Sequence, residues 1–357
     1  MNKLKMVFAS VCISLFLYGC NKEKGPDASA SDDTFKKSML ANYADVLIQP
    51  AYTELQSKLT LLGDAAEQFM ANPSAAAQTT LKQPFKEAYI AYEGISALYF
   101  GPGAALQLNN SLNMFPTSTS RIETGITTTS YDFTLLGASD SIQGFPALDY
   151  LFFGSGAVSR FSDTAAVNRK KYVRDIITRM KLITGNTVSQ WTGGYRDNFT
   201  TSMQTNVGSA IGNLVNQFAY EIDAMKGPRI GWPLGKQSNG TVFADKCEAY
   251  FSGITKDLAI ANLTSLKKFY TGGAGSGIDD YLDLLGKQQL NSDILAQFTT
   301  ALAALQAIPD PMAAAFTGSP ATVETAYREV QKLLTLMKTD LPSATAVQIT
   351  YMDNDGD

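Results

Sequence analysis

Apolar residues recur at steps of three and four along most of this 357-residue chain, and this spacing is the feature that most limits its fold. The steps are clearest in two sets: Val207, Ile211, Leu214, Phe218, Ile222 and Met225, and then Val323, Tyr327, Val330, Leu334 and Met337. Such steps place apolar side chains on one face of a helix, whereas a half-buried strand alternates in steps of two. No long stretch of the sequence alternates in that way. We therefore predict an all-α protein.

The expected helices are separated by glycine-rich segments. We place the helices approximately over residues 34–70, 74–100, 118–137, 145–153, 164–188, 205–226, 244–270, 278–307 and 321–340. The glycine-rich segments lie at residues 193–194, 227–240 and 271–277. From this organisation we expect two helical-bundle domains, over residues 34–190 and 191–357.

Two similar helix starts suggest that the bundles are a pseudo-duplicated pair. Residues 69–73 and 316–320 each begin with phenylalanine and end with proline, and each offers a capping side chain. Proline is tolerated in the first turn because the N–H that it lacks has no intrahelical acceptor there. Any helical protein could use this arrangement twice, so the duplication remains a hypothesis.

The amino-terminal end has the pattern of an export signal. Lys3 and Lys5 precede an apolar run from Met6 to Tyr18, which is typical of a secretory signal and too short for a membrane span. Residues 17–20, Leu-Tyr-Gly-Cys, look like a bacterial lipobox in which Cys20 is acylated. We expect a signal peptide over 1–19 and a flexible tether over 20–33. The protein would then be a lipid-anchored envelope protein, in the outer membrane and either periplasmic or surface-exposed. The alternative is an ordinary signal peptide with an incidental cysteine.

Charge and cysteine content exclude two classes of protein. The net charge of the chain is −4, and removal of Lys3 and Lys5 with the signal makes it −6. Binding of nucleic acid requires a basic face, so nucleic acid is not an expected partner. Of the three cysteines, only Cys247 would remain unmodified in the mature chain, so an intramolecular disulfide is not expected.

The chain contains no histidine. Zinc peptidases and triads of the Ser-His-Asp type depend on imidazole, so both are disfavoured. Mechanisms based on Ser-Lys or on paired carboxylates, and sites for calcium or magnesium, remain compatible with the composition. The acidic end, residues 353–357, resembles the start of a calcium loop but lacks the closing glutamate. We interpret it as a solvated turn, with a weak cation site as the alternative.

The segment GFPALDYLFFG, residues 144–154, is the strongest candidate site. It predicts a short helix in which Asp149 lies among aromatic residues. Asp149 could form a structural ion pair with a basic residue such as Arg121, or contact a ligand in a cleft between the domains. Trp232, in the glycine-rich segment 227–240, is either a cover over the core or an aromatic that binds a ligand.

Several motifs in order resemble those of the imelysin family of bacterial, iron-regulated, exported proteins. The family's Gly-x-His-x-x-Glu hallmark corresponds to Gly144 through Asp149, with Pro146 at the histidine position. Further matches are Tyr92 to Pro102, Asn113-Met114-Phe115-Pro116 with Ile122-Glu123, Arg229 to Gly235, and Glu248 to Ser252 with Asp257-Leu258 and Asn262-Leu263. Together they cover most of residues 35–357.

The resemblance implies two helical bundles with the hallmark near their junction, a link to iron acquisition, and a peptidase name that some members carry. It also shows two departures, because Pro146 replaces the histidine and Ser96 stands where peptidase-like members have an acidic residue. Proline cannot bind a metal or transfer a proton. We therefore expect a non-catalytic binding or accessory protein in iron or haem uptake.

The candidate ligand-binding residues are Asp149, Glu123, Glu248, Ser252, Arg121 and Trp232. The oxygen atoms of Asp149, Glu123 and Glu248 could hold iron or another hard cation, or a basic group of a peptide. Two alternatives are a peptidase that works without histidine and a protein-interaction subunit of a transporter.

Overall fold

The computed structural model describes residues 28–135, 137–164 and 166–351. The predicted signal peptide, Cys20 and the acidic segment 353–357 lie outside these residues. Helices account for the regular structure of the described residues, which include no β-strand, so the all-α prediction is confirmed. Among the same residues, no helix combines the length and the apolar character needed to cross a membrane.

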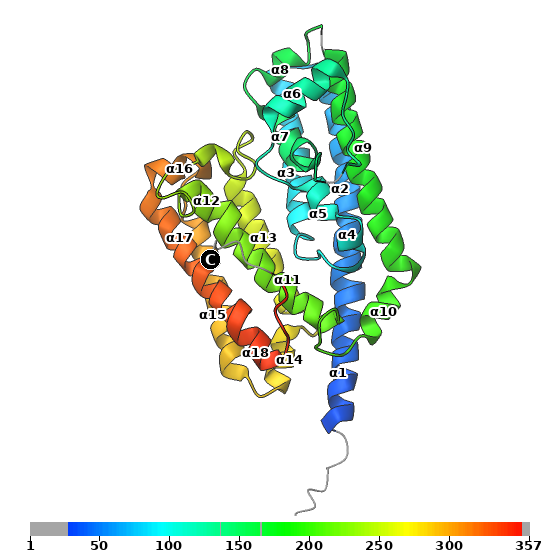
Figure 1. The fold of residues 1–357 in the computed structure, drawn as a ribbon, viewed down its shortest axis with the longest axis vertical. Helices are drawn as coiled ribbons and strands as arrows, with labels where there is room; N and C mark the ends of the chain where they lie inside the picture. Colours follow the sequence, from blue (N-terminus) through cyan, green and yellow to red (C-terminus); the bar gives the residue numbers. More distant parts are fainter. Residues whose placement is uncertain (1–27, 136, 165, 352–357) are drawn as a thin grey trace, which may run out of the picture.

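The helices form two bundles that lie side by side (Figure 1). The first contains α1 (Ala28–Asn42), η1 (Tyr43–Ile48), α2 (Gln49–Ala71), α3 (Ala75–Glu93), α4 (Gly101–Ala105), α5 (Leu108–Leu112), α6 (Thr119–Thr128), η2 (Asp140–Ile142), α7 (Gly144–Phe153), α8 (Ala157–Arg160), α9 (Ala166–Gln190), η3 (Trp191–Tyr195) and α10 (Arg196–Thr201). The second contains α11 (Ala210–Ala224), η4 (Met225–Gly231), α12 (Trp232–Leu234), η5 (Ala244–Lys246), α13 (Thr255–Tyr270), α14 (Ile278–Leu284), α15 (Gln288–Gln306), α16 (Met312–Gly318), α17 (Pro320–Thr335), η6 (Leu336–Asp340) and α18 (Leu341–Thr345).

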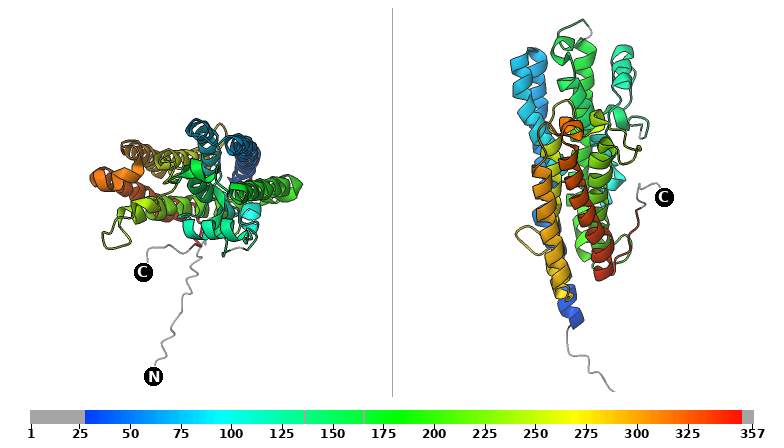
Figure 2. Two further views of the ribbon diagram at one scale, coloured as in Figure 1. Left: turned by 90° about the horizontal axis from the view of Figure 1, so that it is seen from above. Right: turned by 90° about the vertical axis from the view of Figure 1, so that its left-hand side faces the viewer.

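The long helices run close to the long axis of the molecule (Figure 2). In the first bundle α2 packs against both α3 and α9, and in the second α15 packs against α13 and α17. Helix α3 also packs against α13, which joins the bundles, and the buried apolar residues of both form one continuous core. The proposed duplication stays a prediction, whereas η3 and α10, which follow residue 190, pack against α9, α1 and η1 of the first bundle.

Several expected helix limits are wrong, because single residues with a positive φ end or interrupt the helix. The helix expected over 118–137 ends at Thr128, since Thr129 has a φ of 54°. Gly286, with a φ of 72°, divides the helix expected over 278–307 into α14 and α15. Residues 247–254, which were expected to be helical, form turns that contain Ala249 and Gly253 at positive φ.

Other differences concern helix starts. Residues 28–33 belong to α1 rather than to a flexible tether, and Asp32 forms an ion pair with Lys36 one turn later. Helix α3 begins after Ser74, whose hydroxyl accepts a hydrogen bond from Ala77 N, so Pro73 precedes the cap. In α17, by contrast, the proline at position 320 is the first helical residue, as expected.

The glycine-rich loop 271–277 of the second bundle forms hydrogen bonds with α1 of the first bundle. Asn42 Nδ2 donates hydrogen bonds to the carbonyl oxygens of Gly272 and Ser276, at 2.8 and 3.0 Å. A Cβ atom at Gly275 would lie 2.2 Å from Asn42 Oδ1. Close packing of the loop backbone against this side chain explains the glycine at 275.

Candidate functional site

The hallmark segment forms helix α7, and its first residues explain why glycine and proline stand there. Gly144 has a φ of +74°, and a Cβ atom at this position would lie 2.3 Å from the carbonyl oxygen of Leu112. Pro146 is in the first turn, where the absent N–H would have no intrahelical acceptor. Replacing the family's histidine by proline is therefore compatible with the helix, but it removes the imidazole.

Asp149, the hallmark carboxylate, is almost completely buried and binds backbone N–H groups. Its Oδ2 accepts a hydrogen bond from Phe251 N at 2.8 Å, and its Oδ1 accepts one from Ser252 N at 3.0 Å. Burial raises the pKa of Asp149 to about 6, although the hydrogen bonds from Ser252 and Phe251 act in the opposite direction. Asp149 thus holds the segment that connects η5 to α13.

The ion pair between Asp149 and Arg121 that one interpretation expected is not formed. Arg121 is exposed and donates hydrogen bonds to the carbonyl oxygen of Ala138 and, at 3.0 Å, to Ser141 Oγ. It closes the loop between α6 and α7, away from the hallmark carboxylate.

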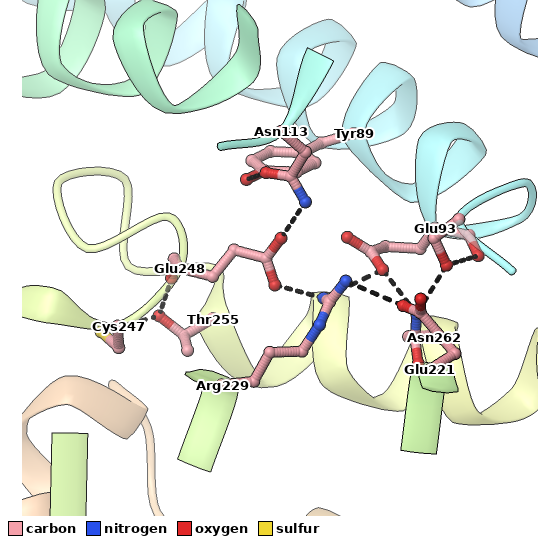
Figure 3. A network of polar contacts seen from close by, with 10 residues as sticks. Tyr89, Glu93, Asn113, Glu221, Arg229, Cys247, Glu248, Thr255 and Asn262 are labelled. Carbon is pink, nitrogen blue, oxygen red and sulfur yellow. Dashed lines mark hydrogen bonds and ion pairs between the residues drawn. The ribbon is translucent and has the colours of Figure 1, made fainter. Parts of the chain in front are cut away.

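A buried charge cluster lies between the two bundles and is centred on Arg229 (Figure 3). Arg229 Nη1 contacts an Oε atom of Glu248 and lies 3.0 Å from Glu93 Oε2, while Nη2 lies 3.1 Å from Glu221 Oε1. All four side chains are at most 6% exposed. Glu93 ends α3 of the first bundle, whereas the other three residues belong to the second. Hence the cluster joins the bundles.

Two asparagines complete the cluster. Asn262 Nδ2 donates to Glu93 Oε2 at 2.9 Å, to Glu221 Oε1 at 2.7 Å and to Ser96 Oγ at 2.8 Å. Asn113 Nδ2 donates to Glu248 Oε1 at 2.6 Å. Ser96, the second departure from the family pattern, therefore lies beside a carboxylate that Glu93 provides from one helical turn earlier.

Arg229 reaches this position from η4, a π-helical segment at the end of α11. A π-helical turn contains an extra residue and redirects the side chains that follow it, and such turns are frequent at functional sites. Three carboxyl groups face a single guanidinium here. Burial raises the pKa of Glu93 well above the usual range of a glutamic acid, and the neighbouring Glu248 and Glu221 raise it further, although Arg229 opposes them. Protonation of Glu93 leaves two carboxylates to balance the one cation.

The three predicted metal ligands, Asp149, Glu123 and Glu248, lie in different environments. Glu123 is bound by Arg169 Nη2 at 2.5 Å, Arg160 Nη1 at 3.0 Å and Tyr150 Oη at 2.7 Å. Glu248 is bound by Arg229 and Asn113, and Asp149 by backbone amides. In the part of the chain that the structure describes, no three His, Cys, Asp or Glu side chains are grouped as metal ligands. Asp149, Glu123 and Glu248 therefore do not form one metal site.

A cavity of about 340 Å³ opens beside the hallmark helix. The residues that line it come from the segment before α6 and the first residue of α6, from α7 and from the segment around η5: Phe115, Pro116, Thr117, Thr119, Pro146, Asp149, Asp245, Lys246, Cys247, Ala249, Tyr250 and Phe251. Phe115 also lies 5.9 Å from the Arg229 guanidinium, so the cavity adjoins the charge cluster. Ser252 is buried behind it, and Trp232, half-buried at the start of α12, is not part of its lining.

Sequence reasoning did not identify Glu93, Glu221 and Asn262 as members of a site. One signal was present, because Glu221 and Asn262 occupy positions in the helical repeat where apolar residues face the core. A polar side chain at such a position must find polar partners. In the sequence Arg229 is distinguished only as part of a motif, and its buried location is evident only in the structure.

Comparison with known proteins agrees with this fold. Two solved structures have the same fold. One is from Parabacteroides distasonis and is designated an iron-regulated protein A precursor, with 19% identity, a TM-score of 0.74, and coverage of 88% of this chain and 95% of that chain. The other is an imelysin-like protein from Psychrobacter arcticum, with 19% identity, a TM-score of 0.71, and coverage of 91% and 99%. No curated protein matches the sequence.

The family comparison is the more specific result. The family model Peptidase_M75: Imelysin matches residues 48–339, which include the hallmark helix, the charge cluster and the residues around the cavity. A match over most of the chain, together with the shared fold, shows that this protein belongs to the imelysin family.

Proposed function

We propose that the protein is a lipid-anchored binding or accessory protein of iron acquisition at the cell envelope, and that it does not act as a peptidase. The proposal is based on the side chains and hydrogen bonds of the hallmark segment, residues 144–154. The Asp149 carboxylate accepts hydrogen bonds from two backbone N–H groups, and Pro146 stands where the family hallmark has histidine. An acid-base pair needs two titratable groups within reach of the proton that is moved, and proline has no group that can accept or donate a proton. The hallmark therefore keeps its shape and supplies no acid-base pair.

The cavity beside α7 supports a binding role. Its volume of about 340 Å³ is within the range of small-molecule sites, and its lining combines aromatic residues with a few charged groups. The charge cluster behind it is buried, and its carboxylates are already paired with Arg229 and the two asparagines. The iron-regulated designation of the similar protein from P. distasonis supports the connection with iron.

Cleavage and binding assays test the proposal together. Purified protein should leave casein and insulin B chain intact with and without a chelator. Cleavage that a chelator inhibits, and that Asp149→Ala abolishes, would overturn the non-catalytic function. Thermal-shift measurements should then find stabilisation by a ligand from a panel of ferric citrate, haemin, hydroxamate siderophores and small organic amines. A ligand at a hundred times its Kd stabilises the fold by about 2.7 kcal/mol. No response to any compound would favour an interaction subunit of a transporter.

The membrane anchor is tested separately. Cys20→Ala should move the protein from the membrane fraction to the soluble fraction, because the acyl chains supply the membrane affinity. Ser38→Ala, a change within α1, is a suitable control and should remain in the membrane fraction. Continued membrane association of the Cys20→Ala protein would contradict the anchor.

A further inference from the structure

The cavity beside α7 has walls that suit an organic cation. Phe115, Tyr250 and Phe251 contribute aromatic rings, and Pro116 and Pro146 contribute further apolar surface. The Tyr250 and Phe251 rings pack edge to face, with centroids 5.2 Å apart, and Tyr150 supports Phe251 from α7 at 5.3 Å. Aromatic faces attract ammonium and guanidinium groups, and several rings around one space strengthen the attraction.

The charges at the cavity are mainly negative. Asp149 and Asp245 are both part of the lining, against one cation, Lys246, which lies 3.3 Å from Asp245. Cys247 also lines the cavity, and burial raises the pKa of its thiol to about 12. The negative charges of Asp149 and Glu248 raise the pKa of the Cys247 thiol further. The electrostatic potential at the wall of the cavity is therefore negative.

Cations behind and around the cavity do not reverse this potential. Arg229 approaches Phe115, but it is bound by three glutamate side chains. Lys82 lies on the exposed surface of α3 and acts on Asp149 only weakly in comparison with burial and hydrogen bonding. Water screens such an exposed charge more strongly than it screens the buried carboxylates.

We propose that the ligand of this cavity carries an organic cation, an alkylammonium or guanidinium group, which is held between the aromatic walls and the carboxylates of Asp149 and Asp245. This inference rests on the proposed binding function and specifies its ligand class. A cavity of about 340 Å³ accepts a group of the size of a lysine or arginine side chain. The same group could come from a free amine or from a basic side chain of a protein. Anionic ferric chelates are disfavoured, because they would bring negative charge to negative walls.

Calorimetric titration tests the ligand class. The free amines are agmatine and cadaverine, and the peptide probe is a pentapeptide with a central lysine. Matched neutral probes are the peptide with norleucine and 1-pentanol. We expect cationic probes to bind at least about tenfold more tightly than their neutral partners, because a charge-assisted contact contributes more than a neutral one. The affinity should decrease as salt increases from 50 to 300 mM. Comparison of amines with the peptide identifies the source.

Two variants should weaken cation binding, and a third should strengthen it. Tyr250→Leu and Asp245→Asn should each weaken cation binding about threefold, the first through the lost ring and the second through the lost charge. Lys246→Met should strengthen binding, because it removes the only cation among the lining residues in the described chain. Tyr220→Leu and Asp310→Asn are controls, since Tyr220 is 38% exposed, as Tyr250 is 39% exposed, and Asp310 is likewise paired with a lysine. Neither control lines the cavity, and neither should change binding.

The outcomes separate this inference from the proposed function. Binding of cationic probes that Tyr250→Leu weakens and Lys246→Met strengthens supports both. Binding of ferric citrate or haemin that Tyr250→Leu weakens, without binding of the amines or the peptide, overturns the ligand class and leaves the binding function intact. Absence of binding by every probe and every iron compound overturns both.

Discussion

Removal of the guanidinium at position 229 should destabilise the protein more than any change to its surface ion pairs. In Arg229→Met three buried glutamates lose the cation that contacts each of them, at 3.0 Å from Glu93 and 3.1 Å from Glu221. Breaking a buried ion pair by removing one partner costs about 3 to 5 kcal/mol, because the remaining charge is left without solvent or a counter-charge. For a chain of this length such a loss lowers the Tm by roughly 4 to 8 °C.

The control is an identical substitution in a solvent-exposed pair. Arg174 binds both carboxylate oxygens of Glu67, at 2.6 and 2.8 Å, but both side chains are about half exposed. Exposed pairs of this kind contribute about 0.2 to 1 kcal/mol. Arg174→Met should therefore lower the free energy of unfolding by less than about 1 kcal/mol.

The pH dependence distinguishes lost charge pairing from lost packing. Arg229 opposes the upward shift of the Glu93 pKa, so without Arg229 this pKa should rise further above its value in the unfolded chain. The folded chain then binds more protons than the unfolded chain, so its stability increases as the pH falls. Urea denaturation followed by circular dichroism should find a larger deficit for Arg229→Met at pH 8 than at pH 5. A deficit equal to that of Arg174→Met, or one that does not change between these pH values, would refute the reasoning.

Three further predictions concern the hallmark helix and the thiol beside it. Gly144→Ala should destabilise the fold by at least about 3 kcal/mol, because its Cβ would lie 2.3 Å from Leu112 O. Gly137→Ala, at a similar φ of +76° but with nothing within 4 Å, should cost only about 1 to 2 kcal/mol, and equal losses in thermal denaturation would contradict the steric argument. Asp149 has a pKa of about 6, against 3.8 for an ordinary aspartate, so wild-type stability relative to Asp149→Asn should rise by about 2 to 3 kcal/mol between pH 7 and pH 4; denaturation curves that show the reverse trend would disprove this. Cys247, with a pKa of about 12, should react with Ellman's reagent only after unfolding, and rapid labelling of native protein would show that the thiol is accessible.

One part of the site could be predicted from the sequence, and another part could not. The hallmark segment could be located because its residues are contiguous in the sequence, and Pro146 fits the first turn of the helix that they form. The partners of Asp149 could not be located in this way. They are backbone N–H groups of Phe251 and Ser252, about a hundred residues away, and every residue offers such a group except proline.

The sequence by itself determined the helical class, since apolar spacing acts within each helix, and it excluded imidazole chemistry, since the chain has no histidine. Tertiary structure alone decided which charges are buried together. Glu93 precedes Glu221 and Glu248 by more than a hundred residues along the chain, and a glutamate in a helix is equally compatible with a solvated surface. Only the packing of two bundles against each other removes water from these three carboxylates and makes Arg229 their common partner.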